Sequence, residues 1–497
     1  MRFPRASGVL LHPTSLPGPH GSGDFGADAR HFVDWLVAGG QRLWQILPLG
    51  GIGAGNSPYM SSSAFAGNVL LIDLADLQTQ GWLEADDLTP PPALQAQRVD
   101  YAAVVPFRMA RLERAAACFA RDGTPPQRAA LAEFVAAQRA WLDDYALFMA
   151  LCEAHAWRDW CDWPPALAAR QPAALAAAGS EHAQRIHFWQ FCQWVFFRQW
   201  LALKAYANER GVEIVGDAPI FIAHQSAEVW ANQTLFELGP DGRPTVVAGV
   251  PPDYFSATGQ RWGNPLYRWS EHAEDGYAWW VDRVRRTLEL VDIVRIDHFR
   301  GFAAHWEIAA EESTAVKGRW VPGPGERLFK AVTKALGPMP IIAEDLGVIT
   351  PDVDALRRKF AFPGMRILQF AFAGNPQDRY LPHNHEPDTV VYTGTHDNNT
   401  TAGWWAEAGD TERHFARGYL ATDGHDMPWT MIRAACMSVA DTCIVPMQDV
   451  LGLPGDCRMN LPGQGSGWWR WRLQWSQVHP WHAQRLAELC RLYGRTG

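Results

Sequence analysis

The segment VDIVRIDHFRG, residues 291–301, places two side chains of opposite charge where they could do chemistry together. Its apolar, β-branched first part predicts a strand, in which Arg295 and Asp297 point to one face and Val294 to the other. An arginine beside a carboxylate favours the ionised form, so we expect Arg295 to lower the pKa of Asp297 and keep it charged as a nucleophile. A surface ion pair at a strand end is the alternative interpretation of this segment taken alone.

Polar residues also stand at or just after the ends of three other apolar runs. They are Asp217, Glu344, Asp345, His396 and Asp397. If the runs are strands of one barrel, their carboxyl ends meet at one face and these groups converge there. Such an acidic cluster either binds a divalent metal or hydrolyses and transfers glycosyl groups with paired carboxylates. The sequence lacks metal-ligand spacing such as HExxH, so glycosyl chemistry is favoured.

The chain carries 25 tryptophans, which is an unusual number. Many stand beside Gly, Asn, Arg and Asp in loop-like stretches: GQRWGNPLYRW (259–269), GWW (403–405) and GSGWWRWRLQW (465–475). A large core is one explanation for them. The other is a sugar ligand, because the C–H face of a sugar ring stacks on an aromatic ring while its hydroxyls bond to polar neighbours.

Eight short apolar runs could supply the strands that position these groups. They are separated by helix-like spans, and their near-continuous apolar composition indicates strands covered on both faces. In chain order the runs are 8–12, 43–47, 212–215, 291–296, 339–345, 365–372, 389–397 and 442–452. This pattern predicts an α/β protein with a (β/α)8 TIM barrel. An open doubly wound sheet is the alternative, and the number of strands disfavours it.

Two long insertions are expected in this barrel, which we predict to be a single catalytic domain over residues 1–497. Residues 75–185 are Ala-rich and helix-patterned, which predicts a mainly helical insertion after the second strand. Residues 218–285 form the insertion between the third and fourth strands. Its segment 249–269 is expected to be a lid over the active site, with an ordinary structured connection as the alternative. The residues proposed for this lid are Pro251, Pro252, Tyr254, Phe255 and Trp262.

The composition narrows the class of protein and its partners. With 47% hydrophobic and 20% charged residues, we expect a soluble globular protein. A net charge of -9 without a basic run disfavours nucleic acid and anionic membranes as partners. No apolar span of about 18 residues and no N-terminal apolar signal are present, which favours a cytoplasmic location. The eight cysteines form no CxxC pair and are expected to be reduced; whether the chain is a monomer or a weak homodimer stays open.

Six longer motifs give the sequence a resemblance to a known family. They are SPYMSSSAFAGN (57–68), GDAPIFIAHQSAEVW (216–230), GVPPDYFSATGQRWGNPLYRW (249–269), VRIDHFRGF (294–302), IIAEDLG (341–347) and YTGTHDNNTT (392–401). Together they resemble the 4-α-glucanotransferases of the amylomaltase type, glycoside hydrolase family 77, related to the α-amylase superfamily. The resemblance covers essentially the full chain. It implies a (β/α)8 barrel with insertions, α-1,4-glucans and maltooligosaccharides as partners, and no organic cofactor or metal.

The resemblance also implies roles for single residues. Asp297 matches the family's nucleophile, Glu344 its general acid/base, and Asp397 the carboxylate that stabilises the transition state. The sugar-binding positions that match are Tyr59, Asp217, Arg295, His396 and Asn460. Trp262 of the lid is expected to support the acceptor. Strand parity cannot choose between the neighbours Glu344 and Asp345, so only the resemblance selects Glu344.

These roles describe a retaining glycosyl transfer. Asp297 would attack the anomeric carbon while Glu344 protonates the leaving oxygen and later deprotonates the acceptor hydroxyl. We therefore expect burial and neighbouring negative charge to raise the pKa of Glu344. The rival interpretations are an α-amylase-like hydrolase, a non-catalytic glucan-binding protein and a metal-dependent hydrolase.

Overall fold

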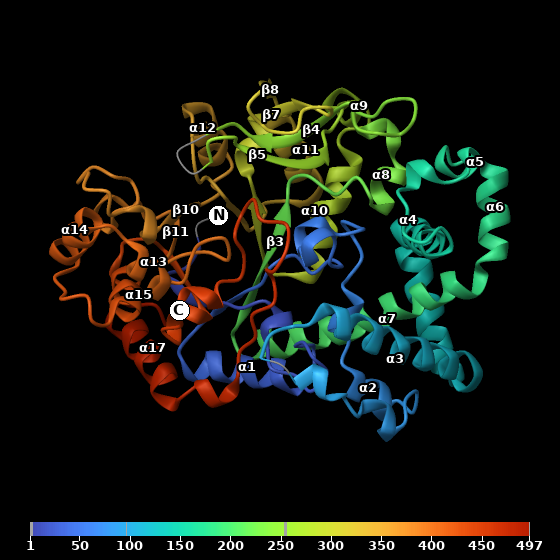
Figure 1. The fold of residues 1–497 in the computed structure, drawn as a ribbon, viewed down its shortest axis with the longest axis horizontal. Helices are drawn as coiled ribbons and strands as arrows, with labels where there is room; N and C mark the ends of the chain where they lie inside the picture. The colour runs from blue at the N-terminus through green and yellow to red at the C-terminus, as the bar shows by residue number, and fades with distance from the viewer. Residues whose placement is uncertain (1–2, 96, 253–255, 497) are drawn as a thin grey trace.

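Eight parallel strands form a central barrel in the computed structural model, which describes residues 3–95, 97–252 and 256–496 (Figure 1). The barrel strands are β1 (Ala6–Leu10), β2 (Leu43–Gln45), β3 (Glu213–Pro219), β6 (Ile293–Asp297), β9 (Ile341–Ala343), β10 (Gly364–Ile367), β11 (Thr389–Tyr392) and β12 (Thr442–Pro446). Except for β9 and β10, each pairs with its neighbour in chain order, and β12 pairs with β1. Between β9 and β10 the Ala343 amide donates to the Pro363 carbonyl at 2.9 Å, which closes the ring. The predicted (β/α)8 barrel is confirmed.

The predicted strands have the right place and order, but most extend too far at their carboxyl ends, whereas 212–215 and 291–296 stop short of the ends of β3 and β6. The runs 365–372, 389–397 and 442–452 leave the sheet after Ile367, Tyr392 and Pro446. Beyond Pro446 the apolar sequence continues as a helical turn, α16 (Met447–Val450), because apolar composition does not distinguish a buried strand from a buried helical turn. His396 and Asp397 therefore lie on a loop beyond the end of β11.

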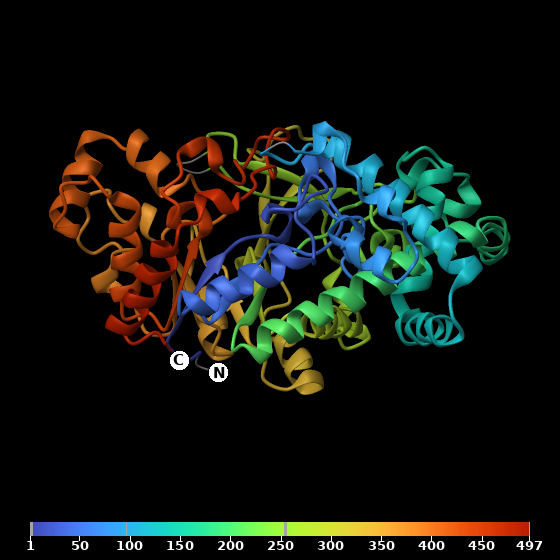
Figure 2. The ribbon, with the colours of Figure 1, turned by 90° about the horizontal axis from the view of Figure 1, so that it is seen from below.

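Helices surround the barrel and cover the apolar outer face of its strands (Figure 1, Figure 2). In the described part of the chain they are α1 (Ala27–Ala38), α2 (Leu74–Thr79), α3 (Tyr101–Asp122), α4 (Pro125–Ala154), α5 (Pro165–Ala168), α6 (Pro172–Glu181), α7 (Ala183–Glu209), α8 (Ala227–Ala231), α9 (Trp269–Glu274), α10 (Ala278–Leu290), α11 (Glu326–Leu336), α12 (Pro351–Lys359), α13 (Thr401–Glu407), α14 (Asp410–Leu420), α15 (Met427–Met437), α16 and α17 (Pro480–Leu492). The two chain ends meet, and Ala6 pairs with Thr496 (Figure 2).

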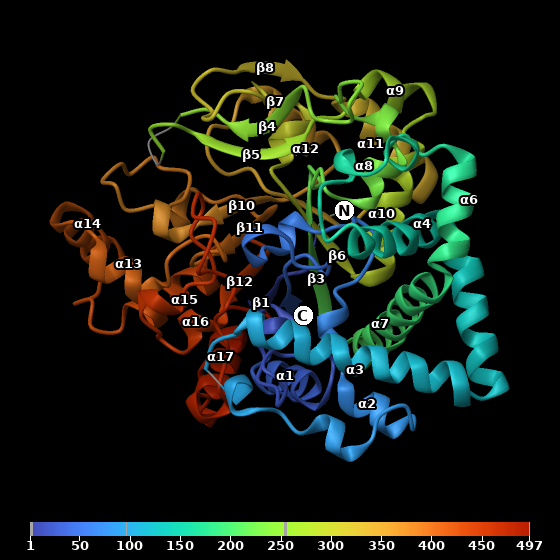
Figure 3. The same ribbon diagram turned by 45° about the vertical axis from the view of Figure 1, so that its right-hand side comes forward.

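The chain between β2 and β3 contributes the long helices α3, α4 and α7, which extend to one side of the barrel (Figure 3). Thr124 begins α4 with a capping box to Gln127. An aromatic cluster joins the helices: the ring centroids of Trp82, Phe119 and Trp194 are 5.2 to 5.7 Å apart. The division of the chain into one catalytic barrel with insertions at 75–185 and 218–285 stays a prediction.

A second, antiparallel sheet lies beside the barrel and was not predicted (Figure 1). Its strands occur in the order β5 (Gln260–Pro265), β4 (Val246–Val250), β7 (Ala304–Ala309) and β8 (Arg319–Pro322). The stretch 259–269, interpreted as loop-like, thus contains a strand. The glycine, asparagine and proline in β5 disfavour a strand by themselves, and pairing with β4 overrides that preference. Tyr254 and Phe255 lie outside the described residues.

The described residues contain no helix that could span a membrane and no disulfide. None of the helices there has the length and apolar character needed to cross a bilayer. All eight cysteines are free, and five of them are buried.

Candidate active site

Arg295 holds two carboxylates together at the carboxyl end of the barrel strands. Its Nη1 donates to both carboxylate oxygens of Asp217, at 2.8 and 2.7 Å, and its Nη2 donates to Asp297 Oδ1 at 2.9 Å. Asp217 on β3 is directly opposite Arg295 on β6, and the two-residue period of the strand brings Asp297 to the same face. The predicted ion pair of Arg295 and Asp297 is present. Arg295 is only 3% exposed and Asp297 is partly buried, so this is not a surface ion pair and that alternative is wrong.

Hydrogen bonds extend from Asp217 to segments far away in the sequence. The Tyr59 hydroxyl donates to Asp217 Oδ2 at 2.8 Å and lies 3.0 Å from His396 Nε2. His396 Nε2 is 3.3 Å from Asp397 Oδ1, which also accepts from Asn460 Nδ2 at 2.7 Å. One connected set of side chains results, which we call the carboxylate network. Its members are Tyr59, Asp217, Arg295, Asp297, His396, Asp397 and Asn460, together with Glu344, which lies within charge-interaction range of Asp297.

Short local motifs orient the aromatic members of the network. Tyr59 lies in the helical turn Pro58–Met60, which begins where the Ser57 hydroxyl accepts from the Tyr59 amide. The Tyr59 ring stacks on His396 with centroids 5.3 Å apart, and Trp469 lies 5.8 Å from each of these rings. A stacked tyrosine and histidine beside carboxylates suit the mixed apolar and polar surface of a sugar.

Glu344 follows β9 directly and is held by main-chain amides. Its Oε2 accepts from the His298 amide and its Oε1 from the Leu346 amide, each at 2.7 Å. His298 has a φ of 53°, a conformation uncommon for a residue with a side chain. This turn comes immediately after Asp297 and aims the His298 amide at Glu344. The residue that follows one carboxylate therefore fixes the position of the other.

Asp345, which strand parity could not exclude, is turned into the protein. It is 0% exposed and accepts from the Met365 amide at 2.6 Å. Its ion pairs are with Arg357, Arg366 and Arg379, at 3.6, 3.3 and 2.8 Å. We call these four residues the arginine cluster. Asp345 has no access to a substrate, whereas Glu344 is partly exposed beside Asp297.

Burial is the largest cause of the pKa shifts of Glu344 and Asp297. Burial, and then the charge of Asp297, raises the pKa of Glu344 to about 8, which confirms the expected direction. For Asp297 the expectation is wrong: burial raises its pKa from the ordinary value, and Arg295 opposes the shift without reversing it. Because Asp297 has a guanidinium partner, the proton that the two groups compete for belongs to Glu344.

Trp262 lies at the edge of the carboxylate network, on β5. Its ring is perpendicular to that of His298 with centroids 4.8 Å apart, and its Nε1 donates to Gln260 Oε1 at 3.1 Å. Trp262 is therefore beside the turn that joins Asp297 to Glu344, although no hydrogen bond connects it to either carboxylate within the described residues.

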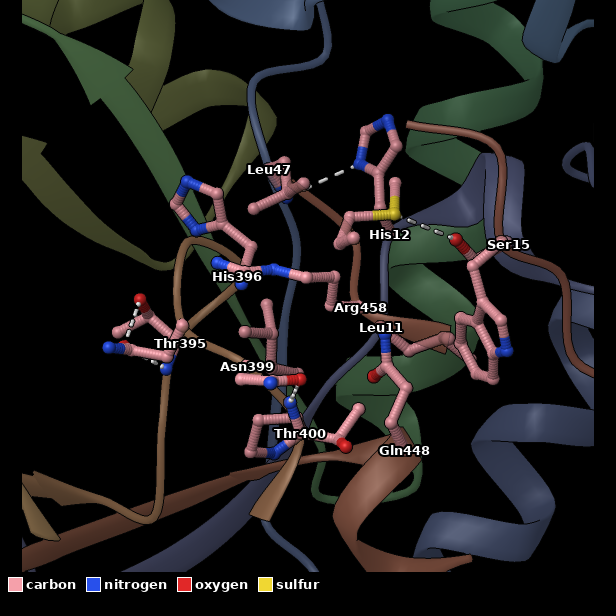
Figure 4. A pocket seen from close by; sticks show the side chains of 15 residues that line it. Leu11, His12, Ser15, Leu47, Thr395, His396, Asn399, Thr400, Gln448 and Arg458 are labelled. Carbon is pink, nitrogen blue, oxygen red and sulfur yellow. Dashed lines mark hydrogen bonds between the residues drawn. The ribbon is translucent and has the colours of Figure 1, made fainter. Parts of the chain in front are cut away.

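A small pocket adjoins the network at His396 (Figure 4). Its walls come from the ends of β1 and β12, from the segments that follow β1, β2, β11 and β12, and from residues 458, 459 and 471. Neither Asp297 nor Glu344 lines it, so it lies next to the reacting groups rather than around them. Within the described part of the chain, no group of three or more His, Cys, Asp or Glu side chains is arranged to hold a metal ion.

Two residues of this cavity were missed by the sequence analysis. His12 ends the first predicted strand, so the rule that identified Asp217 would also have found it. Its Nδ1 accepts from the Leu47 amide at 3.2 Å, and burial lowers its pKa to about 3, which keeps it neutral. Arg458 had no such signal: it ends no predicted strand, and its hydrogen bonds are to main-chain carbonyls, one of them in a distant segment.

Comparisons with known proteins identify the family of the chain. The sequence profile of glycoside hydrolase family 77, described as 4-alpha-glucanotransferase, matches residues 11–477. The chain is 50% identical over 494 residues to the 4-alpha-glucanotransferase of Thermus thermophilus, covering 98% of each chain. It is 48% identical over 495 residues to that of Synechocystis sp., covering 99% of this chain and 98% of the relative. The amylomaltase from Streptococcus agalactiae in complex with acarbose has a TM-score of 0.95 at 38% identity, with 99% of each chain covered.

Proposed function

This chain belongs to the 4-alpha-glucanotransferase family, glycoside hydrolase family 77, and transfers glucan segments, and we propose that Asp297, Glu344 and Asp397 carry out the transfer. The proposed donors are α-1,4-glucans and maltooligosaccharides, and the acceptor is the 4-hydroxyl of another glucan or of glucose. A cytoplasmic location is part of the proposal. The observation that carries it is the pair of Asp297 and the buried Arg295 beside Glu344, and the Glu344 pKa of about 8 keeps that group protonated at neutral pH.

In the first step, Asp297 attacks the anomeric carbon of the donor while Glu344 gives its proton to the leaving glycosidic oxygen. The bond to the leaving glucan breaks and a covalent glycosyl–Asp297 ester forms. Arg295 favours the ionised form of Asp297 by pairing with it, and its bonds to Asp217 fix the guanidinium. Burial lowers the pKa of Arg295, but the charges of Asp217 and Asp297 outweigh this effect, so the guanidinium stays charged.

In the second step, Glu344 is a carboxylate and removes the proton from the acceptor 4-hydroxyl. The acceptor oxygen then attacks the anomeric carbon and releases Asp297. Two inversions leave the α configuration unchanged. The amides of His298 and Leu346 hold Glu344 in place for both proton transfers.

Asp397 faces the positive charge that develops on the donor sugar in both steps. Its carboxylate is held by Asn460, and His396 lies against it, which reduces the reorganisation needed in the transition state. We assign His396, Asn460 and Tyr59 to the binding of the same sugar.

Transfer requires a sugar hydroxyl to react faster than water with the intermediate. We propose that segment 249–269 excludes water and supports the acceptor, with Trp262 as its contact to the site. Its position against His298 supports this role. The assigned lid residues Tyr254 and Phe255 lie outside the described residues.

The test is product analysis after incubation of the purified protein with maltotriose in the presence of a chelator. Transfer predicts glucose and a ladder of longer maltooligosaccharides, and Asp297→Asn and Glu344→Gln should abolish the ladder. Shorter sugars alone would indicate a hydrolase. Loss of the ladder on adding chelator would indicate a metal-dependent enzyme.

A further inference from the structure

Arg458 connects the two segments that meet at Asp397. It lines the cavity beside His396 (Figure 4). Its guanidinium makes two hydrogen bonds, both to main-chain carbonyls of network residues: Nε donates to Asn460 O and Nη2 to Asp397 O, each at 2.7 Å. Within the described residues it forms no ion pair. We propose that Arg458 is a positioning residue that holds Asp397 and Asn460 in reactive geometry, an inference that rests on the function proposed for Asp397.

The fold explains why the loop that carries Asp397 needs such contacts. β11 ends at Tyr392, so no strand ladder fixes Asp397. Three hydrogen bonds join its loop to residues 458–460 instead. They are Arg458 Nη2 to Asp397 O at 2.7 Å, Asn460 N to His396 O at 3.0 Å, and Asn460 Nδ2 to Asp397 Oδ1 at 2.7 Å. Only the last one reaches the Asp397 carboxylate. The first holds the main chain of Asp397, and the second joins the main chains of its partners Asn460 and His396.

An arginine suits this position better than another cation. Its planar guanidinium presents donors in a fixed fork that can reach two carbonyls at once, whereas a lysine ammonium is a single point on a flexible stem. The Arg458 guanidinium also lies 5.8 Å from the centre of the Trp468 ring, which restricts its movement. Loss of the fork should let Asp397 shift, and a displacement of about 1 Å costs roughly 100-fold in rate.

Arg413 on α14 offers a matched control. Its Nε donates to Trp405 O at 3.2 Å, its Nη2 donates to Ala406 O at 2.7 Å, and it lies 5.8 Å from the Trp405 ring centre. The local arrangement is the same as that of Arg458, but neither carbonyl belongs to a residue of the carboxylate network. Arg413→Gln therefore measures how losing such a pair of hydrogen bonds changes kcat and the thermal midpoint when Asp397 is not disturbed.

The experiment compares Arg458→Gln, Arg458→Lys and Arg413→Gln in the full chain, with maltotriose as substrate. We expect Arg458→Gln to lower kcat roughly 10- to 100-fold with little change in KM, because the misplaced group acts mainly in the transition state. Arg458→Lys should recover part of the loss. The thermal midpoint of Arg458→Gln should match that of Arg413→Gln. A kcat equal to that of Arg413→Gln would overturn the proposal.

A double-mutant cycle with Asn460→Ala separates positioning from general stability. If Arg458 acts through Asp397 and Asn460, Arg458→Gln should lower kcat less than about threefold further in the Asn460→Ala background. Effects that multiply fully would overturn the proposal. If Arg458→Gln does not fold, the cycle is run with Arg458→Lys. Full activity of Asp397→Asn would contradict the proposed function itself, whereas an inactive Asp397→Asn with a normal Arg458→Gln would contradict only this inference.

Discussion

Glu344 and Asp345 are neighbours in the chain and carry the same type of group, yet they belong to regions with opposite properties. Glu344 lies in the carboxylate network, partly exposed, and its pKa is raised to about 8 by burial and by Asp297. Asp345 is enclosed by the arginine cluster and has no exposed surface. In the carboxylate network the carboxylates outnumber the cations, so Glu344 holds a proton that it can transfer. In the arginine cluster three cations surround one anion, so Asp345 is a fixed part of the core.

The two regions also differ in what their ion pairs do. In the network, Arg295 bonds both oxygens of Asp217 but only Oδ1 of Asp297. The other oxygen of Asp297 is left for attack on a substrate. In the arginine cluster the oxygens of Asp345 face three guanidinium groups and a main-chain amide. The comparison predicts that substitutions in the first region remove activity and that substitutions in the second remove stability.

The largest effect is expected for Asp297→Asn. The amide cannot form the glycosyl ester, so kcat for transfer from maltotriose should fall by about 10⁴-fold or more. The thermal midpoint should change little, because Arg295 keeps its two bonds to Asp217. Both are measured on the same preparation, by product analysis and by thermal unfolding. Retention of even a few per cent of the activity would remove Asp297 from the role of nucleophile.

Asp345→Asn should have the reverse effect. Removing the charge leaves Arg357 and Arg366 buried without their common partner, which should cost about 3–5 kcal/mol of unfolding free energy. The kcat of the folded enzyme should stay within about tenfold of the wild type, since Asp345 does not reach the site. Urea unfolding and initial rates at low temperature test this. A large loss of kcat at unchanged stability would show that the two regions are not separate.

The pH dependence of kcat/KM should report the raised proton affinity of Glu344. The first step needs Glu344 protonated and Asp297 ionised, so kcat/KM should fall roughly tenfold per pH unit above the Glu344 pKa of about 8. It should also fall on the acid side, where Asp297 takes up a proton. Asp345→Asn should leave the fall of kcat/KM above pH 8 unchanged, because the arginine cluster is not among the causes of the raised Glu344 pKa. A limb near the ordinary glutamate value, with activity already lost at pH 6, would contradict the assignment of Glu344 as the acid.

The smallest effect is expected at the edge of the network, at Trp262. Trp262→Leu removes the ring that packs on His298 but no group that reacts. The ratio of hydrolysis to transfer should rise about two- to fivefold, because water reaches the intermediate more often. The ratio is measured from reducing ends and chain-length distribution. Trp320→Leu, a half-exposed tryptophan on β8, is the control and should leave the ratio unchanged.

Much of the fold could be predicted because its signals are local. The eight apolar runs mark the barrel strands in their correct order, since each strand is buried on both faces. The partnership of Arg295 and Asp297 follows from the two-residue period of a strand and nothing more. Strand ends were less well predicted, and β5 was missed, because hydrogen bonds to other segments decide them.

What only the tertiary structure decided is the environment of each charge. The sequence places Glu344 and Asp345 side by side but does not show that Arg366 and Arg379, more than 20 residues later, surround one of them and leave the other free. It gives the arginine next to Asp297 but not the depth of burial, which reverses the expected direction of the Asp297 pKa shift. Side-chain direction along a strand is fixed by covalent geometry. Burial and net charge are sums over segments that only the folded barrel brings together.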